Sequence, residues 1–149
     1  MGTNSISDEM ENETPQIETR YRRIYRTYTS EDGKKSWDLF VRQDKDKTSV
    51  STIQSEKIAE GEEKTISAFL REEKGNVTLE VWTGFVGDAL KKYERQFIVN
   101  VDYDIGTLFM SEIYDNALHI YNRTTSVSKV SEKIIEFAQM QMKKKQKSL

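Results

Sequence analysis

The sequence predicts an α+β fold in which one or more twisted antiparallel sheets carry two helices. Several short segments alternate apolar and polar residues, which is the pattern of half-buried strands. Two longer segments, residues 61–74 and the chain from about residue 127 onward, repeat apolar residues at helical spacing. Turn-forming dipeptides such as Asp32-Gly33 separate the alternating segments. We therefore expect a sheet with a long amphipathic C-terminal helix packed across it.

Composition limits the classes of protein that fit. The 149 residues suffice for one domain with its own core. The chain has no cysteine, which excludes disulfides, thiolate chemistry and cysteine-ligated zinc. It has no apolar run near the roughly 18 residues of a membrane helix, and its N-terminus lacks the basic and apolar parts of a signal peptide. These features predict a cytoplasmic protein that does not contact membranes.

Residues 1–19 differ from the rest of the chain. They hold the only proline, five acidic residues and no basic residue. Low hydrophobicity with a single sign of charge is typical of disorder. We expect a disordered acidic N-terminal arm, then a single α+β domain over residues 20–145 and a basic tail end at 146–149.

The most informative stretch is residues 20–44, RYRRIYRTYTSEDGKKSWDLFVRQD. Asp32-Gly33 favours a type I′ turn between two strands rich in aromatic and β-branched residues. A two-residue or a four-residue loop sets Tyr28 opposite Trp37 and Tyr25 opposite Phe40, whereas a three-residue loop would shift the register by one. In the first register the core side carries Ile24, Tyr28, Trp37, Leu39 and Val41, with Arg22 and Arg26 at its margin. The outer side carries Tyr21, Arg23, Tyr25, Phe40 and Arg42.

The remaining elements follow from periodicity. Weak alternation at residues 48–55 predicts a third, edge strand. Residues 61–74 place Ile66, Phe69 and Leu70 on one helical face, with Gly75 after the last turn, although a strand over part of this stretch is compatible with Thr65-Ile66-Ser67. Residues 76–85 and 96–103 read as strands.

Two stretches complete the chain. Residues 107–122 fit a hairpin around Asp115-Asn116 better than a helix, although a helix with Phe109, Ile113 and Ala117 on one face remains open. A helix from about Val127, with Ser128 as its N-cap, carries the apolar stripe of Ile134 and Phe137. This order of elements resembles the duplicated β-β-β-β-α architecture of the PUR and Whirly-type single-strand-binding families. The resemblance implies two β-β-β-β-α-like units and a sheet that binds single strands.

The outer side of the hairpin is the candidate functional surface. Proteins bind single-stranded nucleic acid with aromatic rings that stack on bases and with cations that contact phosphates. We therefore expect Tyr21, Arg23, Tyr25, Phe40 and Arg42 to bind single-stranded DNA or RNA. Supporting contacts would come from Arg22, Arg26, Lys34, Lys35 and, as a second stacking residue, Trp82.

Two other functions remain open. The same aromatic surface could bind a protein partner, in which case the chain would be an interaction or regulatory module. A metal-dependent nuclease would use Asp102 and Asp104, which a strand would place on one face, with Glu80. We expect no enzyme activity, no cofactor, no metal and no small-molecule substrate, and we expect a homodimer because the C-terminal helix is long and amphipathic.

Overall fold

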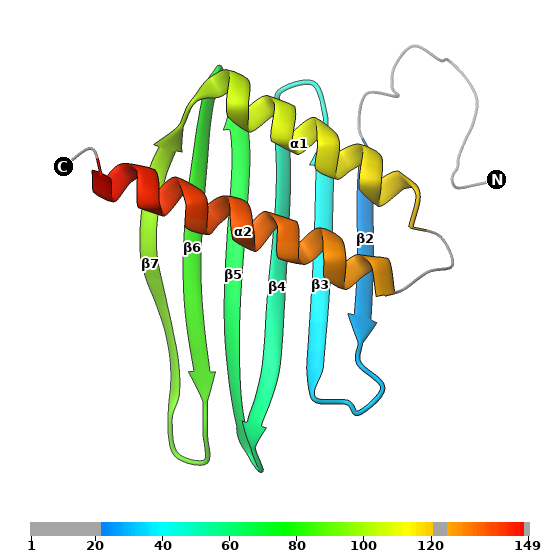
Figure 1. Cartoon of the computed structure of the whole chain (residues 1–149), viewed down its shortest axis with the longest axis vertical. Coiled ribbons are helices and arrows are strands. Elements are labelled where there is room, and N and C mark those ends of the chain that lie inside the picture. Colours follow the sequence, from blue (N-terminus) through cyan, green and yellow to red (C-terminus); the bar gives the residue numbers. More distant parts are fainter. Residues whose placement is uncertain (1–21, 121–124, 148–149) are drawn as a thin grey trace.

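The computed structural model describes residues 22–120 and 125–147 of the chain. In these residues six antiparallel strands follow one another as a meander, and two helices come after them (Figure 1). The strands are β2 (Arg22–Thr29), β3 (Lys35–Gln43), β4 (Lys47–Ala59), β5 (Glu62–Glu73), β6 (Asn76–Val86) and β7 (Lys91–Val101). The helices are α1 (Tyr103–Leu118) and α2 (Thr125–Lys147), and both cross the same face of the open sheet. The expected α+β fold is confirmed. The expected N-terminal arm and Tyr21 lie outside the described residues.

The β2–β3 hairpin has the expected register. Ile24 pairs with Val41, Tyr25 with Phe40 and Tyr28 with Trp37. The loop is the four-residue one: the backbone N–H of Ser30 donates to the carbonyl of Lys35 at 2.9 Å. Gly33 has a positive φ of 73° but Asp32 does not, so the expected type I′ turn is absent. Loops of two and four residues give the same strand register, so each hairpin side chain lies on the face that the sequence predicted.

The carboxylate of Asp32 closes this loop. The Ser30 hydroxyl donates to it at 2.6 Å, and the Lys34 backbone N–H donates to it at 2.9 Å. The Ser30 bond first, and the Lys34 amide second, lower the pKa of the Asp32 carboxyl below its ordinary value. The side chain thus fixes the loop by accepting two local donors.

The helix expected at residues 61–74 is wrong, because this stretch is strand β5. Ile66, Ala68 and Leu70 alternate toward the helices, and Phe69 points the other way. Lys74 and Gly75 both have positive φ, and Glu73 pairs with Asn76, so this glycine forms a two-residue type I′ turn rather than a helix end. Pairing with β4 on one side and β6 on the other decides in favour of a strand.

The edge position expected for residues 48–55 is also wrong. These residues belong to β4, which has 13 residues and lies between β3 and β5. Six consecutive strands precede both helices, so two β-β-β-β-α units are not found in the described part of the chain. The resemblance to duplicated single-strand-binding architectures rested on the predicted order of elements, and the observed order does not support it.

The hairpin favoured at residues 107–122 is wrong, because residues 103–118 form helix α1. The side chain of Asp102 caps this helix by accepting the backbone N–H of Ile105 at 3.0 Å. Met110, Ile113 and Ala117 are buried, at the spacing of one helical face. The Asp115-Asn116 dipeptide lies inside the helix, where burial of this face outweighs the turn preference.

The expected C-terminal helix is confirmed as α2. It begins at Thr125, so Ser128 lies in the first turn and is not the N-cap. Ile134 and Phe137 are buried against the rest of the molecule, as expected. The rings of Phe137 and Phe109 stack at 4.1 Å between centroids, which joins α2 to α1. Neither helix in the described residues has the length and apolar character needed to span a membrane.

The core lies between the helices and two rows of side chains across the sheet. In cross-strand order, the central row is Ile24, Val41, Val50, Leu70, Leu79 and Val99. All six side chains are buried. The core is therefore one-sided, since every second residue of each strand points away from the helices.

The start of α1 lies very close to the sheet at Gly106. A Cβ atom at this position would lie 2.6 Å from Cγ1 of Val77, which is itself buried. At an exposed helical site alanine would stabilise a helix by about 1 kcal/mol over glycine. Here that gain is outweighed, because the neighbouring core side chain has no room to move.

We predict that Gly106→Ala lowers the free energy of unfolding by about 1–3 kcal/mol. Urea denaturation monitored by circular dichroism measures this free energy. Ser111→Ala, at an exposed position of the same helix, is the control and should change stability by less than about 0.5 kcal/mol. An increase in stability for Gly106→Ala would contradict the close packing.

Candidate functional site

The candidate site is the sheet face opposite the helices, here called the open face. No helix of the described residues covers it. The cross-strand registers define its three central rows. They are Arg23, Arg42, Ser49, Arg71, Thr78 and Asn100; Tyr25, Phe40, Ser51, Phe69, Glu80 and Ile98; and Thr27, Asp38, Ile53, Ser67, Trp82 and Arg95.

Tyr25 and Phe40 form an exposed aromatic pair on this face. They stand directly opposite each other on β2 and β3, and their rings stack with centroids 4.5 Å apart. Tyr25 is 52% exposed and Phe40 is 42% exposed. Covering exposed ring surface is favourable, so the pair offers apolar surface that a ligand can bind.

Arginines lie beside this pair. Arg23 and Arg42 are the next cross-strand pair on the same face. Arg71 continues their row across Ser49, and its side chain is exposed. Arg42 also forms an ion pair with Asp44, with Nη2 and Oδ2 3.1 Å apart. The open face therefore places guanidinium groups one residue pair away from the stacked rings.

Arg22 and Arg26 lie on the helix-bearing face, as the hairpin register requires. Nε of Arg26 donates to the carbonyl oxygen of Ile120 at 2.9 Å, just beyond the C-terminal end of α1. Nη1 of Arg22 lies 3.4 Å from the Tyr114 hydroxyl of the same helix. A guanidinium at the C-terminal end of a helix is favoured by the helix dipole. Both arginines thus connect β2 to α1 and do not join Arg23 at the open face.

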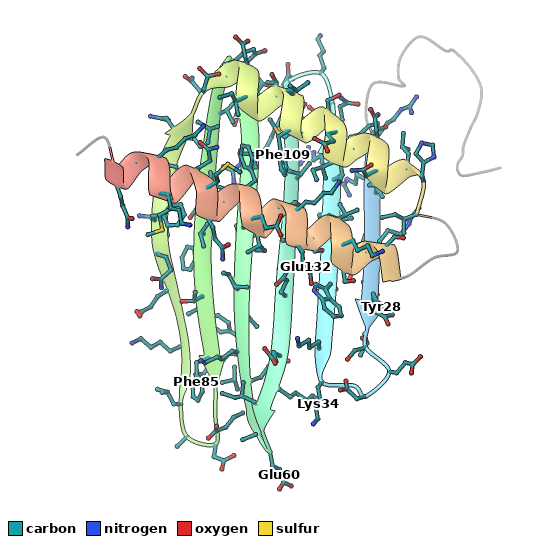
Figure 2. All side chains as sticks on the ribbon, viewed as in Figure 1. Tyr28, Lys34, Glu60, Phe85, Phe109 and Glu132 are labelled. Atoms are coloured by element: carbon teal, nitrogen blue, oxygen red, sulfur yellow. The ribbon has the colours of Figure 1, made fainter. Side chains whose placement is uncertain are left out.

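The two predicted lysines lie elsewhere. Lys34 is in the hairpin loop, below the helices in Figure 2. Lys35 lines a pocket on the helix-bearing side of the sheet. Neither lysine lies beside the Tyr25–Phe40 pair.

Trp82 does lie on the open face, but at the far side of the sheet. Three strand spacings, about 14 Å, separate β6 from β3. The indole N–H of Trp82 donates to Oε2 of Glu80 at 2.8 Å, and the same oxygen lies 3.6 Å from Nη1 of Arg95. Trp82 is therefore held in place by a carboxylate that an arginine partly neutralises.

The sequence analysis missed the residues that connect these two regions. Phe69 and Arg71 lie on the open face between Phe40 and Trp82. Phe69 and Trp82 are diagonal neighbours on adjacent strands, a separation that large aromatic side chains can bridge. Phe69 and Arg71 were missed because residues 61–74 were interpreted as a helix. Reading that stretch with a period of two would have placed both on the face that carries Phe40.

The expected nuclease carboxylates do not share a strand face. Asp102 caps α1, and Asp104 lies in the first turn of that helix. Glu80 is on the open face, bonded to Trp82. Within residues 22–120 and 125–147, no three His, Cys, Asp or Glu side chains are grouped so as to hold a metal ion.

Comparison with known proteins identifies no relative, so the site is interpreted from its geometry. No family model, curated protein or solved structure matches the chain.

One carboxylate on the open face is partly buried. Asp38 lies between Thr27 and Ile53 in cross-strand order, and burial raises the pKa of its carboxyl above the ordinary value of 3.8. A raised pKa means that the ionised carboxylate opposes folding at neutral pH. This cost disappears as the pH falls below the ordinary value, because the group is then protonated in both the folded and the unfolded state.

We predict that Asp38→Asn raises the melting temperature at pH 7 and that the difference from the parent shrinks as the pH falls toward 3. Thermal unfolding across this pH range measures it. Asp46→Asn, in the exposed β3–β4 loop, controls for the loss of one negative charge. A lower melting temperature for Asp38→Asn at pH 7 would show that the carboxylate stabilises the fold.

Proposed function

We propose that the open face binds single-stranded DNA or RNA. The observation that carries the proposal is the stacked, exposed Tyr25–Phe40 pair with Arg23 and Arg42 directly beside it. Bases stack on such rings, and guanidinium groups bind the phosphates that link them. Each stacked base contributes about 1–3 kcal/mol, so a few aromatic contacts suffice for measurable affinity.

Single strands fit this surface better than a duplex. The rings lie on a sheet, and a duplex keeps its base faces stacked and out of reach of such a surface. Phe69 and Trp82 extend the aromatic surface toward the opposite edge, each with an arginine nearby, Arg71 and Arg95. A strand that crosses the sheet perpendicular to the β-strands would meet aromatic and cationic groups in turn.

The charges on the open face favour an anionic ligand, although the chain as a whole is slightly acidic. The whole chain has a formal net charge of −2. On the central rows of the open face, however, Arg23, Arg42, Arg71 and Arg95 outnumber the acidic Asp38 and Glu80. A local excess of cations on a mildly acidic protein can select a polyanion at that surface alone.

The first test removes the aromatic pair. Tyr25→Ala combined with Phe40→Ala should weaken binding of fluorescent dT20 or rU20 by roughly 5- to 150-fold, the loss of about one stacked base. Fluorescence anisotropy at low salt measures it. Tyr103→Ala is the matched control, because Tyr103 is 48% exposed but belongs to α1. If the parent protein binds neither oligonucleotide, the proposed function is wrong.

The second test uses salt. Arg23→Ala should reduce the slope of log affinity against log salt by about 0.7 if its guanidinium contacts one phosphate. Arg22→Ala is a closely matched control, since Arg22 is the preceding residue of the same strand and faces the helices. Equal reductions for both variants would contradict the assignment of the open face.

A protein partner for the same face would give a different result. Exposed aromatic and aliphatic side chains, including Ile98 at 46%, also suit a protein interface. In that case oligonucleotides would not bind, yet the Tyr25 and Phe40 substitutions would abolish the protein association. Binding of oligonucleotides at low salt therefore separates the two functions.

A further inference from the structure

The strands extend beyond the part of the sheet that the two helices cover. β4 and β5 have 13 and 12 residues, and their ends extend beyond α2 together with those of β3, β6 and β7 (Figure 2). The helix-bearing side of these strand ends, bordered by Glu132 of α2, forms a pocket of about 540 Å³. This volume lies in the range of small-molecule sites.

The floor of the pocket is apolar and continues under α2. Trp37, Ile66 and Phe85 are the large apolar residues of the lining, and Trp37 stacks on Tyr28 at 5.5 Å between ring centroids. A second hollow of about 190 Å³ shares Ile66 and Thr83 with the first pocket. It lies between the sheet and α2, and its apolar lining is Ile66, Val81, Phe97, Ile135, Ala138 and Met142. The two spaces together suit a ligand with an apolar chain.

One group of polar side chains in the pocket comes from neighbouring positions of β3, β4 and β5. Nε2 of Gln54 is buried without a hydrogen-bond partner in the described residues. Gln54 stands opposite Ile66, and the next residue pair on the same face is Glu56 with Lys64. Glu56 also stands opposite Lys35, so two lysines flank one carboxylate beside the unpaired amide. A buried donor without an acceptor, next to a local excess of cations, favours a ligand group that accepts hydrogen bonds and carries negative charge.

The other charges of the pocket do not alter this choice. Nζ of Lys92 is paired with Oε1 of Glu94 at 3.1 Å. Glu132 comes from the helix and borders the pocket on the α2 side. Since the whole lining holds three lysines and three glutamates, the position of the charges and not their sum selects the ligand.

We propose that this pocket binds a fatty acid or a similar single-chain carboxylate. The alkyl chain lies over Ile66 and enters the hollow beneath α2, and the carboxylate accepts a hydrogen bond from Gln54 and pairs with Lys64. The pocket lies on the helix-bearing side of the sheet and is independent of the function proposed for the open face. The sequence analysis expected no small-molecule substrate. The pocket residues come from five strands and a helix, so no single stretch of the sequence indicates the site.

Titration calorimetry with decanoate below its micellar concentration tests the proposal on the full chain. One saturable site per chain is expected. Octanoate should bind roughly 15-fold more weakly, since it lacks two methylenes and each buried methylene contributes about fourfold in affinity. Decylammonium, which would prefer Glu56 and Glu132, should bind more weakly than decanoate. No saturable binding, or tighter binding of decylammonium, would overturn the proposal.

Two variants locate the ligand. Lys64→Gln should weaken decanoate at least fivefold and leave decanol unaffected, whereas Lys57→Gln, on the opposite face of β4 from Glu56, should change neither. Ile66→Trp fills the place where the two spaces meet and should weaken both ligands. Circular dichroism establishes that each variant is folded. Unchanged decanoate affinity in folded Lys64→Gln and Ile66→Trp proteins would place the ligand elsewhere and overturn the assignment.

Discussion

Burial on one face only is the constraint on which this structure depends. Side chains of a strand alternate between two faces, and both helices of the described chain cover the same face. Ile113 from α1 and Ile134 from α2 belong to the same buried cluster as the central core row, and this packing removes the central part of that face from water. The opposite face keeps large side chains such as Tyr25 and Phe40 in contact with solvent.

The same constraint separates two surfaces that can act independently. On the open face, aromatic rings and arginines are combined in a way that suits a polyanion with stackable bases. On the other face, the ends of the strands extend beyond α2 and are not covered by a helix. This leaves the pocket between Trp37, Phe85 and Glu132. A ligand in one of these sites does not obstruct the other, because the sheet lies between them.

The hairpin and the last helix were predictable because their signals are local. The Asp32-Gly33 loop has even length, which fixes the faces of Tyr25, Phe40, Arg23 and Arg42. By contrast, residues 61–74 satisfy both periods: Ile66 and Leu70 lie on one face of a helix and on one face of a strand. Phe69 distinguishes the two, and the structure leaves it on the open face, where sequence reasoning assigned it to a core.

The sequence by itself determined the α+β class, the hairpin faces for a loop of even length and the amphipathic α2, since each follows from local spacing. Only the tertiary structure decided that residues 62–73 form a central strand and that residues 103–118 form a helix. It also brought Phe69 and Arg71 beside the predicted hairpin face and assembled the pocket around Gln54. The physical reason is that backbone pairing and burial on one face act between segments far apart in the chain, where local preference no longer discriminates.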